Sequence, residues 1–327
     1  MWFKVVLIVL SISQLGLAAA INSTLEKHHA ATVEEVITNI TTSCICQQPT
    51  SPDVTQYPPG STPSYPAAAC WEIQNLNPTA PSGYYWLRGT NGSSFRMYCD
   101  MSMSCEGVSG GWMQLAKIDM NNSNETCPEG LRPLTTPKRL CGMNIDGGGC
   151  SPATFKVNGI QYTNVCGKII GYQQRSPDAF NRYVGNRGLT IDDQYVDGIS
   201  LTHGLNPRKH IWTFAAALDE VSSSSRYICP CINNNTESSP IPPYVGSDYF
   251  CDTGSENTWE YRFYPDDPLW DGQGCGRSNT CCSFNNPPWF RKELSSSTAD
   301  DIEMRLCADE GRGNEDVPVE VIELYVQ

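Results

Sequence analysis

Sixteen cysteines constrain the fold of this chain more than any other feature of the sequence. Their number is even, and all of them lie from Cys44 onward. In an oxidising compartment such cysteines form disulfides, which stabilise secreted domains that have small cores and long loops. Zinc is the alternative, but the chain has no pair of Cys-x-x-Cys sequences and only four histidines. The cysteines therefore predict a disulfide-rich extracellular protein.

The N-terminus has the pattern of a secretory signal peptide over residues 1–20. Lys4 supplies a positive charge, Val5 to Leu10 form an apolar run, and Ala18-Ala19-Ala20 offers a small-residue cleavage site. The apolar run is short for a membrane span, and an uncleaved anchor is the alternative. We expect the mature chain to be soluble, secreted and extracellular.

The formal net charge of −13 argues against nucleic acid as a partner, because phosphate binding requires clustered Lys and Arg. The spare carboxylates could hold calcium, or simply form a solvated acidic surface. Sequons for N-glycosylation also agree with secretion. They are at Asn22, Asn39, Asn91, Asn121, Asn124 and Asn234.

Residues 21–46 and 47–69 are expected to form a stalk and a linker. Val33, Val36, Ile37 and Ile40 of the first segment have helical spacing. A helix this short is marginal alone, so we expect a homo-oligomer through residues 21–46. Cys44 and Cys46 are candidates for interchain disulfides, with intrachain pairing as the alternative. The second segment is rich in Pro, Ser and Thr and is expected to be an extended spacer.

Residues 70–327 are expected to form a disulfide-rich head of the α+β class, mostly β and loop. No internal repeat or long helical pattern is present. In residues 302–307, Ile302, Met304 and Leu306 alternate with Glu303 and Arg305, which predicts one solvated side. The other expected strands are 84–88, 95–100, 112–119, 168–172, 199–202, 211–217, 259–264 and 319–326.

A hairpin pattern opens the head, with aromatic runs on both sides of an Asn91-Gly92 turn. Residues 70–120 resemble the first subdomain of the fibrinogen-like C-terminal domain, and intelectins have a similar opening. The matching residues are Cys70, Gly83, Tyr85, Tyr98-Cys99-Asp100-Met101 and Gly110-Gly111-Trp112. The resemblance implies a Cys70–Cys99 disulfide.

Residues 121–327 complete the head and match that family less well. They contain neither its tandem-tryptophan segment nor its calcium loop in recognisable form. Segments such as Tyr195 to Gly204 and Cys281 to Phe290 are similar to fibrinogen-related proteins of early-branching animals. This resemblance supports the fold and implies no ligand.

The late loops supply the first candidate site. Asp266, Asp267 and Asp271 place carboxylates close together near turn residues, as calcium ligands require. Trp270 and Trp289 are nearby aromatic residues on which a sugar ring could stack, and Asn285 and Asn286 could bind its hydroxyls. Packing of these aromatic side chains in the core is the alternative.

His203 and His210 flank an expected turn and form a second candidate pair. They could bind a metal or transfer protons, or they could be structural residues held by hydrogen bonds. The chain has no Gly-x-Ser-x-Gly, His-Glu-x-x-His, phosphate-loop or dinucleotide-loop sequence. We therefore expect a non-enzymatic lectin that binds a carbohydrate or glycoprotein surface, with calcium as candidate cofactor. The alternative is a structural matrix or mucus protein whose head assembles with itself.

Overall fold

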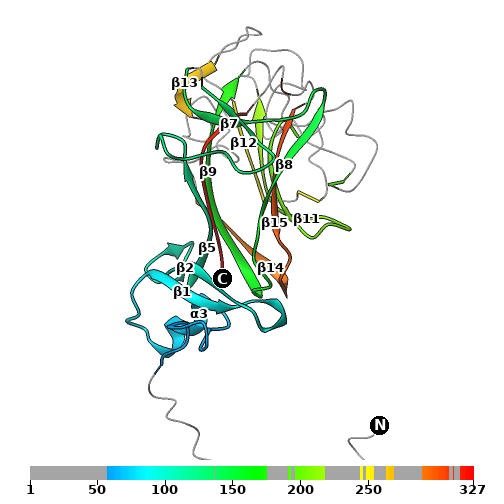
Figure 1. Cartoon of the computed structure of the whole chain (residues 1–327). Helices are drawn as coiled ribbons and strands as arrows, with labels where there is room; N and C mark the ends of the chain where they lie inside the picture. Colours follow the sequence, from blue (N-terminus) through cyan, green and yellow to red (C-terminus); the bar gives the residue numbers. More distant parts are fainter. Residues whose placement is uncertain are drawn as a thin grey trace, which may run out of the picture. The chain divides into compact units, whose positions relative to one another are not determined.

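A computed structural model gives the fold of the chain (Figure 1). It describes residues 57–135, 137–174, 191–192, 196–217, 244–245, 248–253, 263–268, 289–308, 312 and 317–327. The chain divides into Met1–Gln56 and a compact unit, Tyr57–Gln327, which is the head described below. The expected signal peptide and stalk, including Cys44, Cys46, Asn22 and Asn39, lie outside the described residues, as does Asn234.

The larger sheet of the described head has nine strands. The strand β16 is at its centre and pairs antiparallel with β5 and β9. Strands β13 and β14 pair with the other side of β9, so the sheet branches there. Its strands are β1 (Gly83–Arg88), β2 (Ser94–Asp100), β5 (Trp112–Asp119), β16 (Val319–Val326), β7 (Leu140–Gly142), β6 (Arg132–Leu134), β9 (Tyr162–Gln174), β13 (Phe263–Pro268) and β14 (Phe290–Thr298).

A second sheet has five strands, in the order β12-β11-β10-β15-β8. All its pairs are antiparallel except β11 with β12. A small β3–β4 hairpin lies outside both sheets. The bounds of these strands are β12 (Tyr249–Thr253), β11 (Lys209–Ala217), β10 (Gly198–His203), β15 (Ile302–Ala308), β8 (Gly149–Phe155), β3 (Ser104–Cys105) and β4 (Val108–Ser109).

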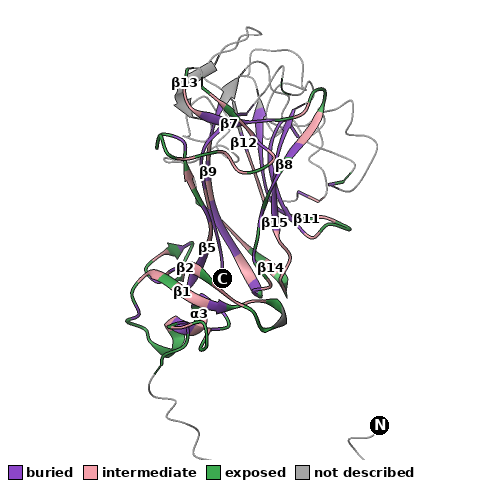
Figure 2. Ribbon diagram, viewed as in Figure 1, coloured by how far each residue is buried: buried purple, intermediate pink, exposed green. Residues whose placement is uncertain are grey.

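The two sheets bury their apolar faces against each other (Figure 2). Ile169 and Leu324 from the larger sheet belong to the same buried cluster as Leu201, Phe214 and Met304 from the smaller one. Alternate residues of a strand point to opposite faces, which is why these strands can each supply an apolar side to one core. The prediction of a mostly β, disulfide-rich fold is confirmed.

The hairpin at the start of the head forms as predicted, from β1 and β2 with a 3-10 turn at Thr90–Gly92. The Cys70–Cys99 disulfide is also present, with 5.4 Å between the two Cα atoms. Cys70 begins the short helix α3 (Cys70–Leu76), so the bond joins a helix to β2. Further pairs among the described residues are Cys105–Cys166, Cys127–Cys141 and Cys150–Cys307.

The head begins before Cys70, within the segment assigned above to the linker. Ala67 pairs with Leu87 of β1 as an isolated bridge and is buried. The backbone carbonyl of Gly60 accepts a hydrogen bond from the amide of Trp86. Proline-rich sequence can therefore pack along a strand edge, where few backbone donors are needed.

The prediction of a solvated side for the strand at residues 302–307 is wrong. All residues of β15 are buried, and Glu303 and Arg305 are only 7% and 8% exposed. Arg208, which lies far from β15 in the sequence, forms an ion pair with Glu303, and Asp192 forms an ion pair with Arg208. The strand forms as the alternation predicts, but both of its faces are covered.

Most of the other expected strands are present, and two sequons lie on the surface. Residues 259–262 of one expected strand lie outside the described residues. Asn121 and Asn124 are exposed in the turn after β5. No helix among the described residues has the length and apolarity needed to cross a bilayer.

Candidate functional site

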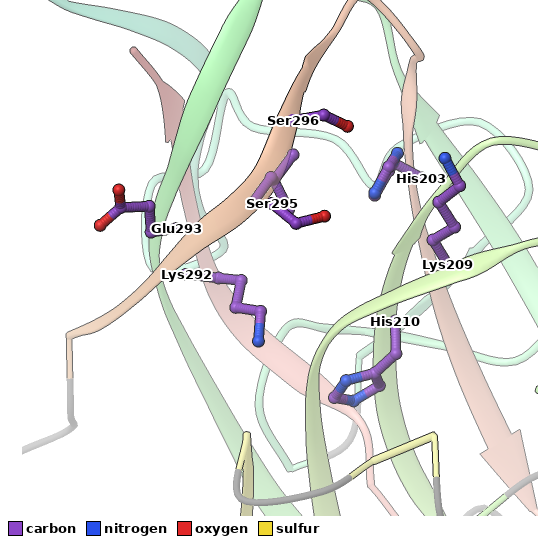
Figure 3. A pocket seen from close by; sticks show the side chains of 8 residues that line it. His203, Lys209, His210, Lys292, Glu293, Ser295 and Ser296 are labelled. Carbon is purple, nitrogen blue, oxygen red and sulfur yellow. The ribbon is translucent and has the colours of Figure 1, made fainter.

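A cavity of about 480 Å³ lies between β14 of the larger sheet and the β10–β11 hairpin of the smaller one (Figure 3). Polar residues dominate its wall, and two of them are the histidines singled out from the sequence. The lining residues are His203, Lys209, His210, Lys292, Glu293, Leu294, Ser295 and Ser296.

The β10–β11 hairpin positions one wall of the cavity. His203 ends β10 and pairs in register with Lys209, the first residue of β11. The register shifts after Leu201, so that Thr202 lies opposite His210. The turn between the strands contains Asn206 and Pro207, residue types that favour turns. Two histidines that are seven positions apart in the chain thus line one cavity.

The strand β14 supplies the opposite wall. Phe290 is 3% exposed and stacks on Trp212 of β11, with 4.5 Å between ring centroids. Side chains alternate along the strand, so Lys292 lies on the same side as Phe290 and points into the cavity (Figure 3). The Glu293 carboxylate points away from the cavity in Figure 3 and lies 3.4 Å from Nη1 of Arg291.

His203 is held in place by a carboxylate. Its Nδ1 lies 2.9 Å from Oδ2 of Asp300, and the residue is 5% exposed. Hydrogen bonds with His203 and Thr298 lower the pKa of Asp300, so this carboxylate is ionised and only accepts. Nδ1 therefore carries a proton, and Nε2 is the ring nitrogen that can meet a ligand.

His210 is partly buried and is neutral at neutral pH. Its Nε2 is 2.8 Å from Oγ1 of Thr213. Burial lowers the pKa of His210 to about 4, an effect that Asp248 opposes and Lys292 reinforces. The Lys292 ammonium forms an ion pair with Asp248.

The burial of His210 predicts lower stability in acid. Its ordinary pKa is 6.5, so the unfolded chain takes up a proton there as the pH falls below 6.5, whereas the folded chain does so only near pH 4. The free energy of unfolding should therefore decrease between these pH values. The His210→Gln variant keeps a polar group near Thr213 without titrating, and should show a shallower decrease.

Urea unfolding at several pH values between 4 and 8 would measure this effect, with disulfides kept intact. The two proteins should give parallel curves above pH 7, where His210 of the wild-type protein is neutral in both the folded and the unfolded chain. Equal slopes for both proteins below pH 6.5 would show that His210 does not titrate differently on folding.

The expected calcium and sugar residues are mostly outside the described part of the chain. Asp266 and Asp267 lie in the strand β13. Asp271, Trp270, Asn285 and Asn286 lie outside the described residues. Within the residues that the structure describes, no group of three or more His, Cys, Asp or Glu could hold a metal ion. Calcium binding therefore stays a prediction.

Trp289 is the one expected sugar-stacking residue whose surroundings are described. It is 39% exposed and lies against Tyr325, with 6.2 Å between ring centroids. The ammonium of Lys168 lies 5.0 Å from the centre of its indole ring. Tyr325 belongs to a small buried cluster with Trp112, separate from the main core. Trp289 therefore has packing partners and also keeps part of its ring in solvent.

Sequence reasoning missed the wall formed by β14. Lys292, Ser295 and Ser296 were not predicted as site residues, because the run Ser295-Ser296-Ser297-Thr298 has the composition of a loop. Only the apolar residues Phe290 and Leu294, separated by the charged run from Arg291 to Glu293, hint at a strand there. The cavity thus joins two predicted histidines to an unpredicted strand.

The arrangement presents imidazole, ammonium and hydroxyl groups on strands that pack on the core. Groups of this kind bind polar ligands, because each can form hydrogen bonds without rearranging the backbone. No protein-family model matches the chain.

Proposed function

We propose that this is a secreted recognition protein of the fibrinogen-related type, whose head binds carbohydrate in the cavity between β14 and the β10–β11 hairpin. The cavity carries this proposal. Its volume of about 480 Å³ is in the usual range for small-ligand sites, and its lining residues are mostly polar. The fibrinogen-like pattern of residues 70–120 supports the family assignment.

The chemistry of the wall favours a sugar over an apolar ligand. Ser295 and Ser296 offer hydroxyl groups that donate and accept, and His203 offers Nε2. Among the described residues that line the cavity, Leu294 is the one apolar residue. A sugar presents many hydroxyls within a small volume, and such a wall can satisfy several of them together.

Binding is proposed to be non-enzymatic and multivalent. Several heads joined through residues 21–46 would raise the avidity of weak single sites for repeated glycans. Asp266, Asp267 and Asp271 remain candidates for calcium. Chelation of calcium tests whether that site contributes to binding.

The alternative is a structural matrix or mucus protein whose head assembles with itself. Exposed aromatic side chains near the start of the head favour it, since such groups often mark protein contacts. They are Tyr57, Tyr65, Trp71 and Tyr84. Concentration-dependent association of the head with no glycan binding would support this alternative.

Filling the cavity should abolish carbohydrate binding. Ser296 lies on the cavity wall and is exposed, so the Ser296→Trp variant should fold while its indole occupies the ligand space. On a glycan array, the wild-type protein should bind and this variant should not. The control is Ser297→Trp, because Ser297 is the adjacent exposed residue and its hydroxyl bonds to Gln161 outside the cavity lining. Equal binding by both variants would place the site elsewhere.

A further inference from the structure

The charges around the cavity point to an acidic ligand. Lys209 and Lys292 both line it, and an ammonium group can donate hydrogen bonds but cannot accept them. The Glu293 carboxylate is turned away, towards Arg291. The groups that face the interior are therefore rich in donors and positive charge, although the whole chain carries a net charge of −13.

Two carboxylates near the cavity already have partners. Asp300 accepts from Nδ1 of His203, and Asp248 forms the ion pair with Lys292. Neither aspartate is among the residues that line the cavity. They hold His203 and Lys292 in place, and their charges offset those of the two lysines.

Lys209 differs from Lys292 in this respect. Its side chain is exposed, and within the described residues it forms no ion pair. Its charge does reach Asp300, whose pKa it helps to lower. In Figure 3 the ammonium group of Lys209 lies beside the His203 imidazole, with Ser295 and Ser296 across the cavity. An incoming anion would meet the Lys209 cation and the serine hydroxyl donors at this point, and Nε2 of His203 would be left to accept from a hydroxyl of the ligand.

We propose that the ligand of this cavity is an acidic saccharide, whose carboxylate or sulfate binds beside Lys209 and opposite Ser295 and Ser296, while Nε2 of His203 accepts a hydrogen bond from a sugar hydroxyl. This inference rests on the proposed function, since it names the class of sugar. The ammonium of Lys209 forms a charge-assisted hydrogen bond with the anion. Sugar hydroxyls are then left to contact the remaining polar groups of the wall.

Matched polysaccharides test the inference, because they share a backbone and differ in the acidic group. Biolayer interferometry with the full chain would compare dextran, carboxymethyl dextran and dextran sulfate. Salt at about 0.15 M screens interactions between distant surface charges. We expect at least one acidic polymer to bind, and each acidic polymer that binds to do so at least roughly 10-fold more tightly than its neutral counterpart. The carboxylated and sulfated members show which acid is preferred.

Variants locate the anion. Lys209→Ala should weaken binding of the acidic polymer roughly 10- to 100-fold, the loss expected for one charge-assisted hydrogen bond. Lys117→Ala removes an exposed lysine of β5 and should leave binding unchanged. Both lysines are exposed, so unchanged melting temperatures would show that the variants fold. An equal loss in both variants would overturn the inference, because binding would then follow net charge.

The outcomes separate this inference from the proposed function. Equal binding of neutral and acidic polymers would overturn the acidic ligand and leave carbohydrate binding in place. Polyacrylate, a carboxylate polymer without sugar, is the second control. If it binds as tightly as the acidic polysaccharides and Lys209→Ala weakens it equally, anion binding holds and the carbohydrate function fails. Failure of every polymer to bind would overturn both.

Discussion

The Glu303→Ala variant is expected to lose roughly 3–5 kcal/mol of the free energy of unfolding, the usual cost of removing one partner of a buried ion pair. Oε1 of Glu303 lies 2.8 Å from Nε of Arg208 and 3.6 Å from Nε of Arg305. Arg305 is only 8% exposed, and its burial lowers its pKa, with the charge of Arg208 adding to that effect. Without Glu303, two guanidinium groups would remain close together with less compensation.

Urea unfolding of the disulfide-intact protein would measure the loss. Glu303→Gln keeps an acceptor but removes the charge, so we expect a smaller loss than with alanine. The matched control is Glu129→Ala, because Glu129 is exposed and should change stability by less than about 0.5 kcal/mol. A loss below about 1 kcal/mol for Glu303→Ala would mean that water reaches the two arginines and replaces the carboxylate.

The surroundings of Glu303 also show what sequence reasoning could and could not supply. The alternation of Ile302, Met304 and Leu306 predicted a strand and the face that packs on the core, and both are present. The same alternation predicted a solvated opposite face. That face is covered by Asp192 and Arg208, which come from distant segments of the chain. The periodicity within one strand cannot show which distant residues will pack on it.

The candidate site, likewise, could be predicted only in part from the sequence. His203 and His210 stood out in the sequence because a turn separates them and their chemistry is distinctive. Lys292 comes from β14, which pairs with β9 and so arrives at the cavity from the other sheet. Its position depends on how the two sheets stack, which no pattern within a single strand could reveal. The family resemblance, in contrast, implied the Cys70–Cys99 bond, which is present.

The Trp212→Ala variant is expected to lose roughly 3–5 kcal/mol of stability, the usual cost of truncating a buried tryptophan. Trp212 is 3% exposed on β11, and its ring lies at an 11° angle to that of Phe290 on β14. Phe250 of β12 packs against the same indole, with 5.7 Å between ring centroids. Trp212→Phe keeps an aromatic ring at this place and should recover much of the loss. Trp71→Ala, at a tryptophan that is 44% exposed, is the control.

The same variant tests whether the two walls of the cavity depend on this stack. Trp212 and Phe290 join the two strands from which Lys209, His210 and Lys292 reach the ligand space. Truncating the indole leaves Phe290 without its stacking partner, so β14 can shift relative to the β10–β11 hairpin. We therefore expect Trp212→Ala to bind acidic polysaccharide at least roughly 10-fold more weakly, even at temperatures where it is folded. Undiminished binding by the folded variant would show that the cavity is held by the strand pairing of β9 and β14 instead.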